Sequence, residues 1–207
     1  MAIIGCSYLR VAKYNYHQVG GVEYTDPAII AKLVRIRIEL ENGNDNDFYA
    51  DNGIDETDNQ FAGGKFSMNT NDLTNEASET ILGVTSESLE TIEGITDEGV
   101  KELIFDDDQV SPELGIGVVI KHKRRGETVW TGLIICRAMF QIPAEEAETQ
   151  GKTISWQTPT LEGTIMRDDS EKHRWKRKAT FTTESQAIAY VNARLGGNTG
   201  QGSSQQG

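Results

Sequence analysis

Residues that could do metal or thiol chemistry are few in this chain, and their spacing is unfavourable. Three histidines (His17, His122 and His173) and two cysteines (Cys6 and Cys136) are scattered over 207 residues. None of them shows the spacing that places several ligands around one zinc ion. Two thiols are also too few for a disulfide framework. We therefore expect two reduced, packed cysteines and no zinc site.

Motifs for catalysis and for cofactor binding are missing from the sequence as well. The acidic run 106–108 matches no calcium-binding loop. There is no phosphate-binding loop, no nucleophile elbow and no metalloprotease helix. Gly115 and Gly117 lack the third glycine and the helix of a dinucleotide site. The sequence thus predicts a protein that is not an enzyme, with no metal and no cofactor.

Two basic segments, 121–125 and 172–178, could bind an anion or a nucleic acid, and Trp175 lies within the second of them. The alternative is a solvated hairpin tip and a charged strand face, complementary to an acidic surface of a neighbour. The formal net charge of −12 and the pI near 4.7 favour the second interpretation, because phosphate binding needs positive surface.

Charge is distributed unevenly along the chain. Residues 39–113 hold 21 acids and two bases, a net charge of −19, and the remaining residues carry +7. Such a run is typical of a solvated surface. It also fits subunits that dock basic on acidic surface, or a face that repels an anion. No apolar run is long enough to span a membrane, and the N-terminus lacks the basic region of a signal peptide.

Hydrophobic periodicity predicts a mainly β fold. Residues 33–41 alternate, with Ile36, Ile38 and Leu40 on one side and charged residues on the other. The segment 128–142 is long for one strand, so we expect it to bend or to serve two sheets. The other predicted strands are 63–69, 114–121 (forming a hairpin with 128–142), 153–165 with an edge or bulge at Pro159, and 174–182.

Two short helices are expected beside these strands. The first has Asp72 as N-cap, apolar residues at 73, 77 and 81, and Gly83 as its end. The second begins at Thr183, which has capping-box spacing to Gln186. Residues 84–110 read as loop with short strands, and residues 42–60 as a long polar loop with an aromatic island at 48–50.

The arrangement of these segments resembles the major tail protein, or tail tube protein, of bacteriophages with long non-contractile tails. The resemblance rests on an early strand leading to a long loop with FYADN (48–52), and on the helix segment DLTNEASETILG (72–83). It continues through GIGVVIKHKRRGE (115–127) and QGKTISWQTPTLEGTI (150–165). Asp168, Asp169 and the pair Trp175-Lys176 stand where the family often has Asp-Gly before Trp-Lys. Together these marks cover about 165 of the 207 residues.

This resemblance implies a β-sandwich or split barrel with a flanking α-helix and a long inter-strand loop. Residues 1–195 would be one tail-tube domain, and 196–207 a Gly/Ser/Gln-rich tail. The expected function is structural: hexameric rings stack into a hollow tube through which genomic DNA passes during ejection, without specific binding. The implied partners are other copies of the chain, a tape-measure protein, and tail terminator and distal tail proteins. The implied location is the virion, after assembly in the host cytoplasm, with no membrane involved.

The expected site residues fall into two groups. The long loop is expected to stack one ring on the next, with aromatic residues as anchors because these are enriched at interface cores. The alternative is that they pin the loop to its own domain. Its candidates are Asp47, Phe48, Tyr49 and Asp51. Candidates for a face lining the lumen or a subunit interface are Arg35, Arg37, Glu39, Glu41, Lys65, Ser67, Thr131 and Gln141.

Arg35 and Arg37 argue against a uniformly acidic channel wall, and pairing with Glu39 and Glu41 of a neighbour is one way to accommodate them. Two other classes of protein stay open. One is the related tube of a bacterial secretion or injection machine. The other is a monomeric β-sandwich binding module, in which tryptophans would form a carbohydrate platform; the candidates are Trp130, Trp156 and Trp175.

Overall fold

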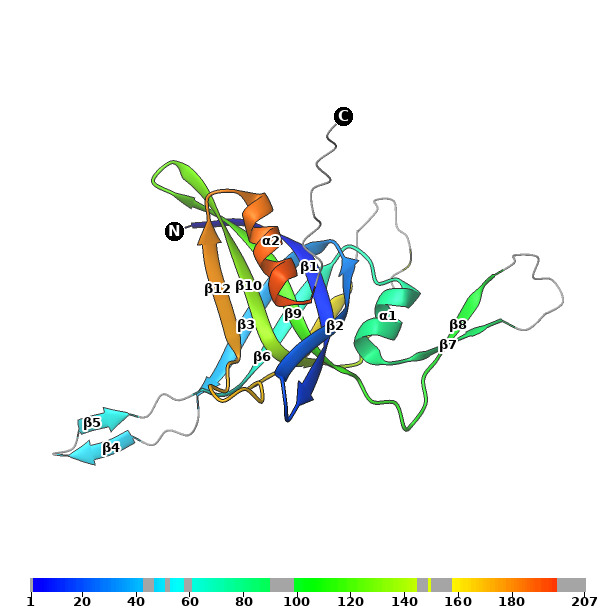
Figure 1. The fold of residues 1–207 in the computed structure, drawn as a ribbon, viewed down its shortest axis with the longest axis horizontal. Helices are drawn as coiled ribbons and strands as arrows, with labels where there is room; N and C mark the ends of the chain where they lie inside the picture. Colours follow the sequence, from blue (N-terminus) through cyan, green and yellow to red (C-terminus); the bar gives the residue numbers. More distant parts are fainter. Residues whose placement is uncertain are drawn as a thin grey trace. The chain divides into compact units, whose positions relative to one another are not determined.

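The protein is mainly β, as the sequence predicts. The computed structural model describes residues 2–42, 47–50, 53–57, 61–89, 99–144, 149 and 158–196. In these ranges the chain forms antiparallel strands and two α-helices (Figure 1). The predicted tail beyond residue 196 lies outside the described residues.

The chain divides into two compact units, and each is described by itself. The first unit comprises residues 1–29, 114–137 and 167–207, and the second comprises residues 30–113 and 138–166. Strand β10 (Glu127–Phe140) contributes residues to both units. The single domain expected over residues 1–195 stays a prediction.

The first unit is a sheet with the strand order β2-β1-β9-β10, in which β12 also pairs with β10. Its elements besides β10 are β1 (Ala2–His17), β2 (Gly21–Ala31), β9 (Glu113–Arg124) and β12 (Lys176–Phe181). The register of β1 on β9 shifts between Ser7 and Arg10, where Tyr8 has a φ of 60°. This irregularity turns the Tyr8 hydroxyl to Asn192 of helix α2, to which it donates a 2.7 Å hydrogen bond.

Helix α2 (Glu184–Arg194) packs on this sheet as a consequence of its sequence. Thr183 caps it as predicted, its hydroxyl accepting from the backbone N–H of Gln186. The helix and the sheet bury a common apolar cluster, which consists of Ala12, Val119, Ile134, Ala187, Val191 and Leu195. The close approach requires a residue without a side chain at Gly117, where a Cβ would lie 2.5 Å from Val191 Cγ1.

The second unit contains the strand order β10-β11-β6-β3, so β3 is its terminal strand. Its strands are β3 (Leu33–Asn42), β6 (Phe61–Thr70) and β11 (Thr160–Met166). One face is apolar, and the rings of Phe66 and Phe140 meet there edge-on at 5.0 Å. Also buried are Met68, Leu161 and Ile165.

Helix α1 (Asn75–Leu82) begins later than the sequence predicts. Its N-cap is Thr74, whose hydroxyl accepts from the backbone N–H of Ala77, and not Asp72. The Asp72 carboxylate instead accepts from the N–H of Leu73 at 2.8 Å, outside the helix. The predicted end is confirmed, because Gly83 takes a φ of 68° as the left-handed C-cap.

Two small hairpins complete the second unit. Strands β7 (Thr85–Ser88) and β8 (Lys101–Ile104) are the short strands expected in the acidic segment. The expected polar loop 42–60 contains a hairpin of its own, made by β4 (Asp47–Ala50) and β5 (Gly53–Thr57). Strands β4 and β5 were not predicted, because a segment of four or five residues is too short for its alternation to be recognised.

The predictions for the long strand and for Pro159 have mixed outcomes. Strand β10 pairs with β12 as well as β11, but these strands belong to one sheet, so the expectation that it serves two sheets is wrong, and a bend stays a prediction. The expectation of an edge at Pro159 is wrong, because β11 begins after it and lies between β10 and β6, whereas a bulge there stays a prediction. A proline just before a strand removes no ladder donor, and its carbonyl accepts from Thr70 N–H at 3.1 Å. Residues 153–157 lie outside the described part.

Candidate assembly surface

A polar face lies opposite the apolar face of the second unit's sheet. The register of β3 on β6 places Arg35 beside Asn69, Arg37 beside Ser67, and Glu39 beside Lys65. Paired residues share a face of an antiparallel sheet. Six of the predicted residues are thereby brought together: Arg35, Arg37, Glu39, Glu41, Lys65 and Ser67.

Strand β11 extends this face by residues that were not among the predicted candidates. Thr160 pairs with Asn69, Glu162 with Ser67, and Thr164 with Lys65. The amide of Asn69 donates a 2.8 Å hydrogen bond to the Thr160 hydroxyl. The alternating pattern of TLEGTIM (160–166) could have indicated these residues in the sequence. We call the whole set the polar face: Arg35, Arg37, Glu39, Glu41, Lys65, Ser67, Asn69, Thr160, Glu162 and Thr164.

The polar face is electrically balanced, with three bases and three acids among these ten residues. Arg37 pairs with Glu39 along β3, and Lys65 Nζ lies 3.2 Å from a carboxylate oxygen of Glu41. Glu39 and Glu41 thus have bases of their own chain as partners, rather than requiring those of a neighbour. Ion pairs this exposed contribute about 0–1 kcal/mol each, so they set the charge pattern more than the stability.

The remaining two candidates of this group lie in different places. Gln141 is exposed directly after β10, and its backbone N–H donates to the carbonyl of Glu162 at 2.9 Å. Because Phe140 is on the apolar face, alternation puts Gln141 on the polar side. Thr131 lies in the first unit, is buried, and its hydroxyl lies 2.9 Å from that of Thr180 on β12. The structure does not bring Thr131 together with the polar face.

The candidates of the stacking loop lie in or beside the β4–β5 hairpin. Asp47 pairs with Thr57, Phe48 with Glu56, and Tyr49 with Ile54 along the backbone. Their side chains and the whole of Asp51 lie outside the described residues. Their part in stacking stays a prediction.

Asp168, one of the residues carrying the resemblance, has a structural role in the first unit. It is buried, and one carboxylate oxygen accepts from the backbone N–H of Ser170 at 3.2 Å and of Arg174 at 2.6 Å. These bonds fix the turn that leads into β12. Buried polar groups need such partners, so this aspartate is explained by folding alone.

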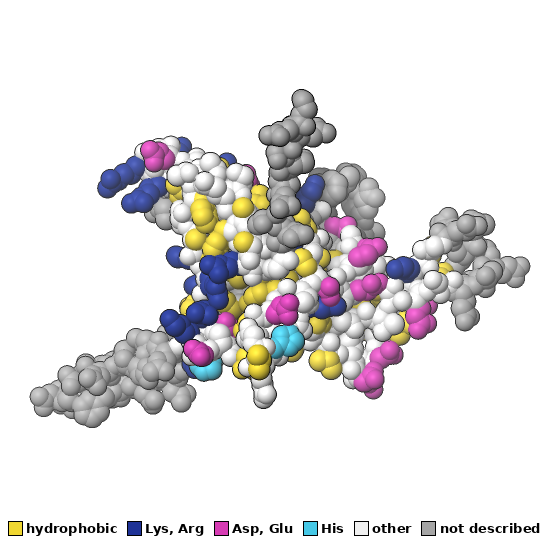
Figure 2. Space-filling model, in the orientation of Figure 1, with side chains coloured by type: hydrophobic (Ala, Val, Ile, Leu, Met, Phe, Trp, Pro, Cys, Tyr) yellow, Lys and Arg dark blue, Asp and Glu magenta, His cyan; other side chains and the backbone are white. Residues whose placement is uncertain are grey.

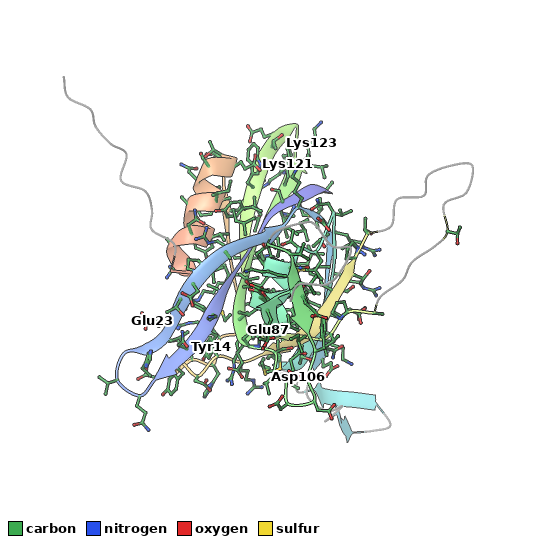
Figure 3. All side chains as sticks on the ribbon, turned by 90° about the vertical axis from the view of Figure 1, so that its right-hand side faces the viewer. Tyr14, Glu23, Glu87, Asp106, Lys121 and Lys123 are labelled. Carbon is green, nitrogen blue, oxygen red and sulfur yellow. The ribbon has the colours of Figure 1, made fainter. Side chains whose placement is uncertain are left out.

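Its neighbour Asp169 joins the turn to β1 through Tyr14, which is labelled in Figure 3. The Tyr14 hydroxyl lies 3.0 Å from the Asp169 carboxylate, which also receives Arg137 at 2.9 Å. Burial, together with the acidic partner, raises the pKa of Tyr14 to about 12. The tyrosine therefore stays protonated at neutral pH and links β1 to the turn by hydrogen bonds.

Both cysteines and one of the candidate tryptophans are also packed against other residues of the first unit. Cys136 is buried and Cys6 half-buried, and burial raises the pKa of both thiols. Trp130 packs against the apolar cluster beneath α2, and Trp156 lies outside the described residues. Within the described ranges no three His, Cys, Asp or Glu side chains are grouped to hold a metal ion.

Comparisons with known proteins do not assign the chain to a group. No family model matches it, and no curated protein matches it significantly. No helix in the described part of the chain has both the length and the apolar character needed to cross a membrane.

Proposed function

We propose that the protein is a structural subunit of a phage tail tube, in which copies form hexameric rings that stack around a channel for DNA. The observation that carries this proposal is the polar face on the sheet that ends at β3. The apolar back of β6 and β11 is buried within the unit and that of β3 partly so, whereas the front carries ten polar residues in these three adjacent strands. A wall between a packed core and a water-filled channel needs this combination.

The terminal position of β3 supports association with further copies. A terminal strand carries backbone groups that can pair with a strand of another chain, and closing a barrel across subunits removes such edges. Heterologous contacts of this kind close into rings or continue as filaments.

The charge balance of the polar face fits a conduit better than a binding site. A surface of mixed charges offers no continuous positive stripe for phosphate, on which DNA affinity depends. Arg37 and Lys65 are each neutralised by a carboxylate of the same chain. DNA would pass such a wall without being held.

Electron microscopy combined with cysteine labelling tests this function. Purified protein should form tubes, and Ser67→Cys would put a thiol in the centre of the polar face, in a Cys6→Ser background. In tubes, this thiol should react with a small maleimide but not with a large polymer-linked one. Ala189→Cys, on the exposed side of α2, is the matched control, and both thiols should react with both reagents before assembly.

The outcomes separate the parts of the proposal. Exclusion of both reagents at Ser67→Cys would place the polar face in a subunit interface, and reaction with both would place it outside the tube. Protein that never assembles under nucleating conditions would contradict the proposed function itself.

A further inference from the structure

Lys and Arg are concentrated in one unit and Asp and Glu in the other. The first unit has 14 bases and 7 acids, a net charge of +7, and the second has 6 bases and 25 acids, a net charge of −19. In space-filling view, Lys and Arg gather over the β9–β10 hairpin and along β12, and Asp and Glu over α1 and the β7–β8 hairpin (Figure 2).

The basic surface is best defined at the tip of the β9–β10 hairpin. Arg125 and Gly126 both have positive φ, 48° and 89°, so the strands are joined by a tight two-residue turn. Lys121, Lys123, Arg124 and Arg125 are exposed there. We call these four residues the basic tip.

The basic tip is held in place by the strands that carry it. Lys121 Nζ lies 5.8 Å from the centre of the Trp130 ring, and the side chains of Lys121 and Lys123 project from the hairpin (Figure 3). No ion pair neutralises the four charges among the described residues. A cluster of exposed, unneutralised bases is suited to an acidic partner.

The second unit has an exposed acidic surface that is complementary in charge to the basic tip. Glu87 of β7 lies directly opposite Glu102 of β8, and both are exposed. Like charges in this arrangement destabilise a strand pair, so a cationic partner would relieve them. The turn after β8 adds three exposed aspartates at 106–108, flanked by Phe105 and Val110, which are 50% and 74% exposed. We call Glu87, Glu102, Asp106, Asp107 and Asp108 the acidic patch.

We propose that the basic tip of one copy docks on the acidic patch of a second copy. This inference rests on the proposed function and names the contact that would drive assembly. Pairing of two basic tips, or of two acidic patches, is repulsive, so the charges favour a head-to-tail contact that repeats. A nucleic acid is a poorer partner for the tip, because the whole chain carries −12.

Charge exchange between two variants tests the docking. Lys123→Glu with Arg124→Glu brings the charge of the tip from +4 to 0, and Glu102→Lys with Asp107→Lys brings that of the patch from −5 to −1. Each variant alone should assemble more than about tenfold less than wild type, because the attraction between tip and patch is then lost. Mixing the two should give mixed oligomers that neither variant forms alone, since the unchanged tip of the patch variant can dock on the unchanged patch of the tip variant. Assembly is measured by light scattering and microscopy, and thermal unfolding verifies that each variant is folded.

A matched control separates this contact from net charge. Lys32→Glu with Lys172→Glu changes two exposed lysines that are not part of the tip and gives the same net charge as the tip variant. This control should assemble like wild type. Raised salt should weaken wild-type assembly, because the screening length falls from about 8 Å at physiological salt to about 3 Å at 1 M.

Other outcomes overturn the docking in distinguishable ways. Normal tubes from the tip variant would refute the contact and leave the proposed function standing. Binding of a labelled DNA duplex by wild type, abolished in the tip variant while assembly is unchanged, would assign the tip to a nucleic acid. A wild type with no tubes and no salt-sensitive oligomers would contradict both proposals.

Discussion

The two units of this protein treat the faces of their sheets differently. In the first, α2 covers the sheet, and the covered positions are apolar or glycine, as at Gly117 and Ile134. In the second, the face of β3, β6 and β11 that bears Arg37 and Lys65 carries ten polar residues. The difference shows that close packing restricts which residues can occupy a covered face, whereas an exposed face requires only that polar residues alternate with apolar ones along each strand.

The largest expected effect is the loss of stability when a buried strand glycine is replaced by alanine. A Cβ on Gly163 would overlap the carbonyl oxygen of Met139 and the ring of Phe66. Gly163→Ala should therefore lower the free energy of unfolding by about 3 kcal/mol. Gly117→Ala meets the side-chain ends of Val191 and Leu195, which can move, and should cost about 1–2 kcal/mol. Denaturant unfolding measures both.

A strand glycine with open space is the control for these two variants. No atom lies within 4 Å of a Cβ added at Gly5, so Gly5→Ala should change stability by less than about 0.5 kcal/mol. Equal costs at Gly163 and Gly117 would show that contact with a backbone carbonyl and a ring is no more costly than contact with side-chain ends.

Helix capping is an intermediate effect that both units should share. Thr74 and Thr183 each accept a hydrogen bond from the backbone N–H three residues later. Replacing either by alanine should cost about 1 kcal/mol of unfolding free energy, and replacement by serine should retain most of it. Thermal unfolding of the four variants measures this. A loss at one cap only would mean that the helix of the other unit does not depend on its cap.

The smallest effect concerns pH and the first unit alone. Burial and the nearby Lys178 lower the pKa of His122 from its ordinary 6.5. The unfolded chain therefore binds the proton first, so this histidine destabilises the fold as the pH falls below 6.5 and has no effect above it. His122→Gln should remove this loss, about 0.5 kcal/mol or less because the ring is only half-buried.

An NMR titration of His122 supplies the direct measurement. Lys178→Gln should raise the pKa of His122 by removing a neighbouring positive charge. Wild type and His122→Gln should be equally stable at neutral pH. A pKa at or above 6.5 in the wild type would contradict the expectation.

Much of the framework could be predicted from local sequence, because local patterns carry it. Alternation over 33–41 gives β3, Thr183 and Gln186 mark the start of α2, and Gly83 ends α1. A capping hydroxyl is harder to select when several candidates are adjacent, which is why Asp72 was predicted where Thr74 caps.

The sequence by itself determined that the protein is mainly β, that its charge is segregated, and that β3 has a polar side. Only the tertiary structure decided which polar residues share a surface. Glu162 lies beside Ser67 because β11 pairs with β6, although the two strands are far apart in the sequence. Thr131 is buried where β10 pairs with β12. The physical reason is that alternation defines the sides of one strand, whereas register and neighbouring strands decide whether a side meets solvent or packing.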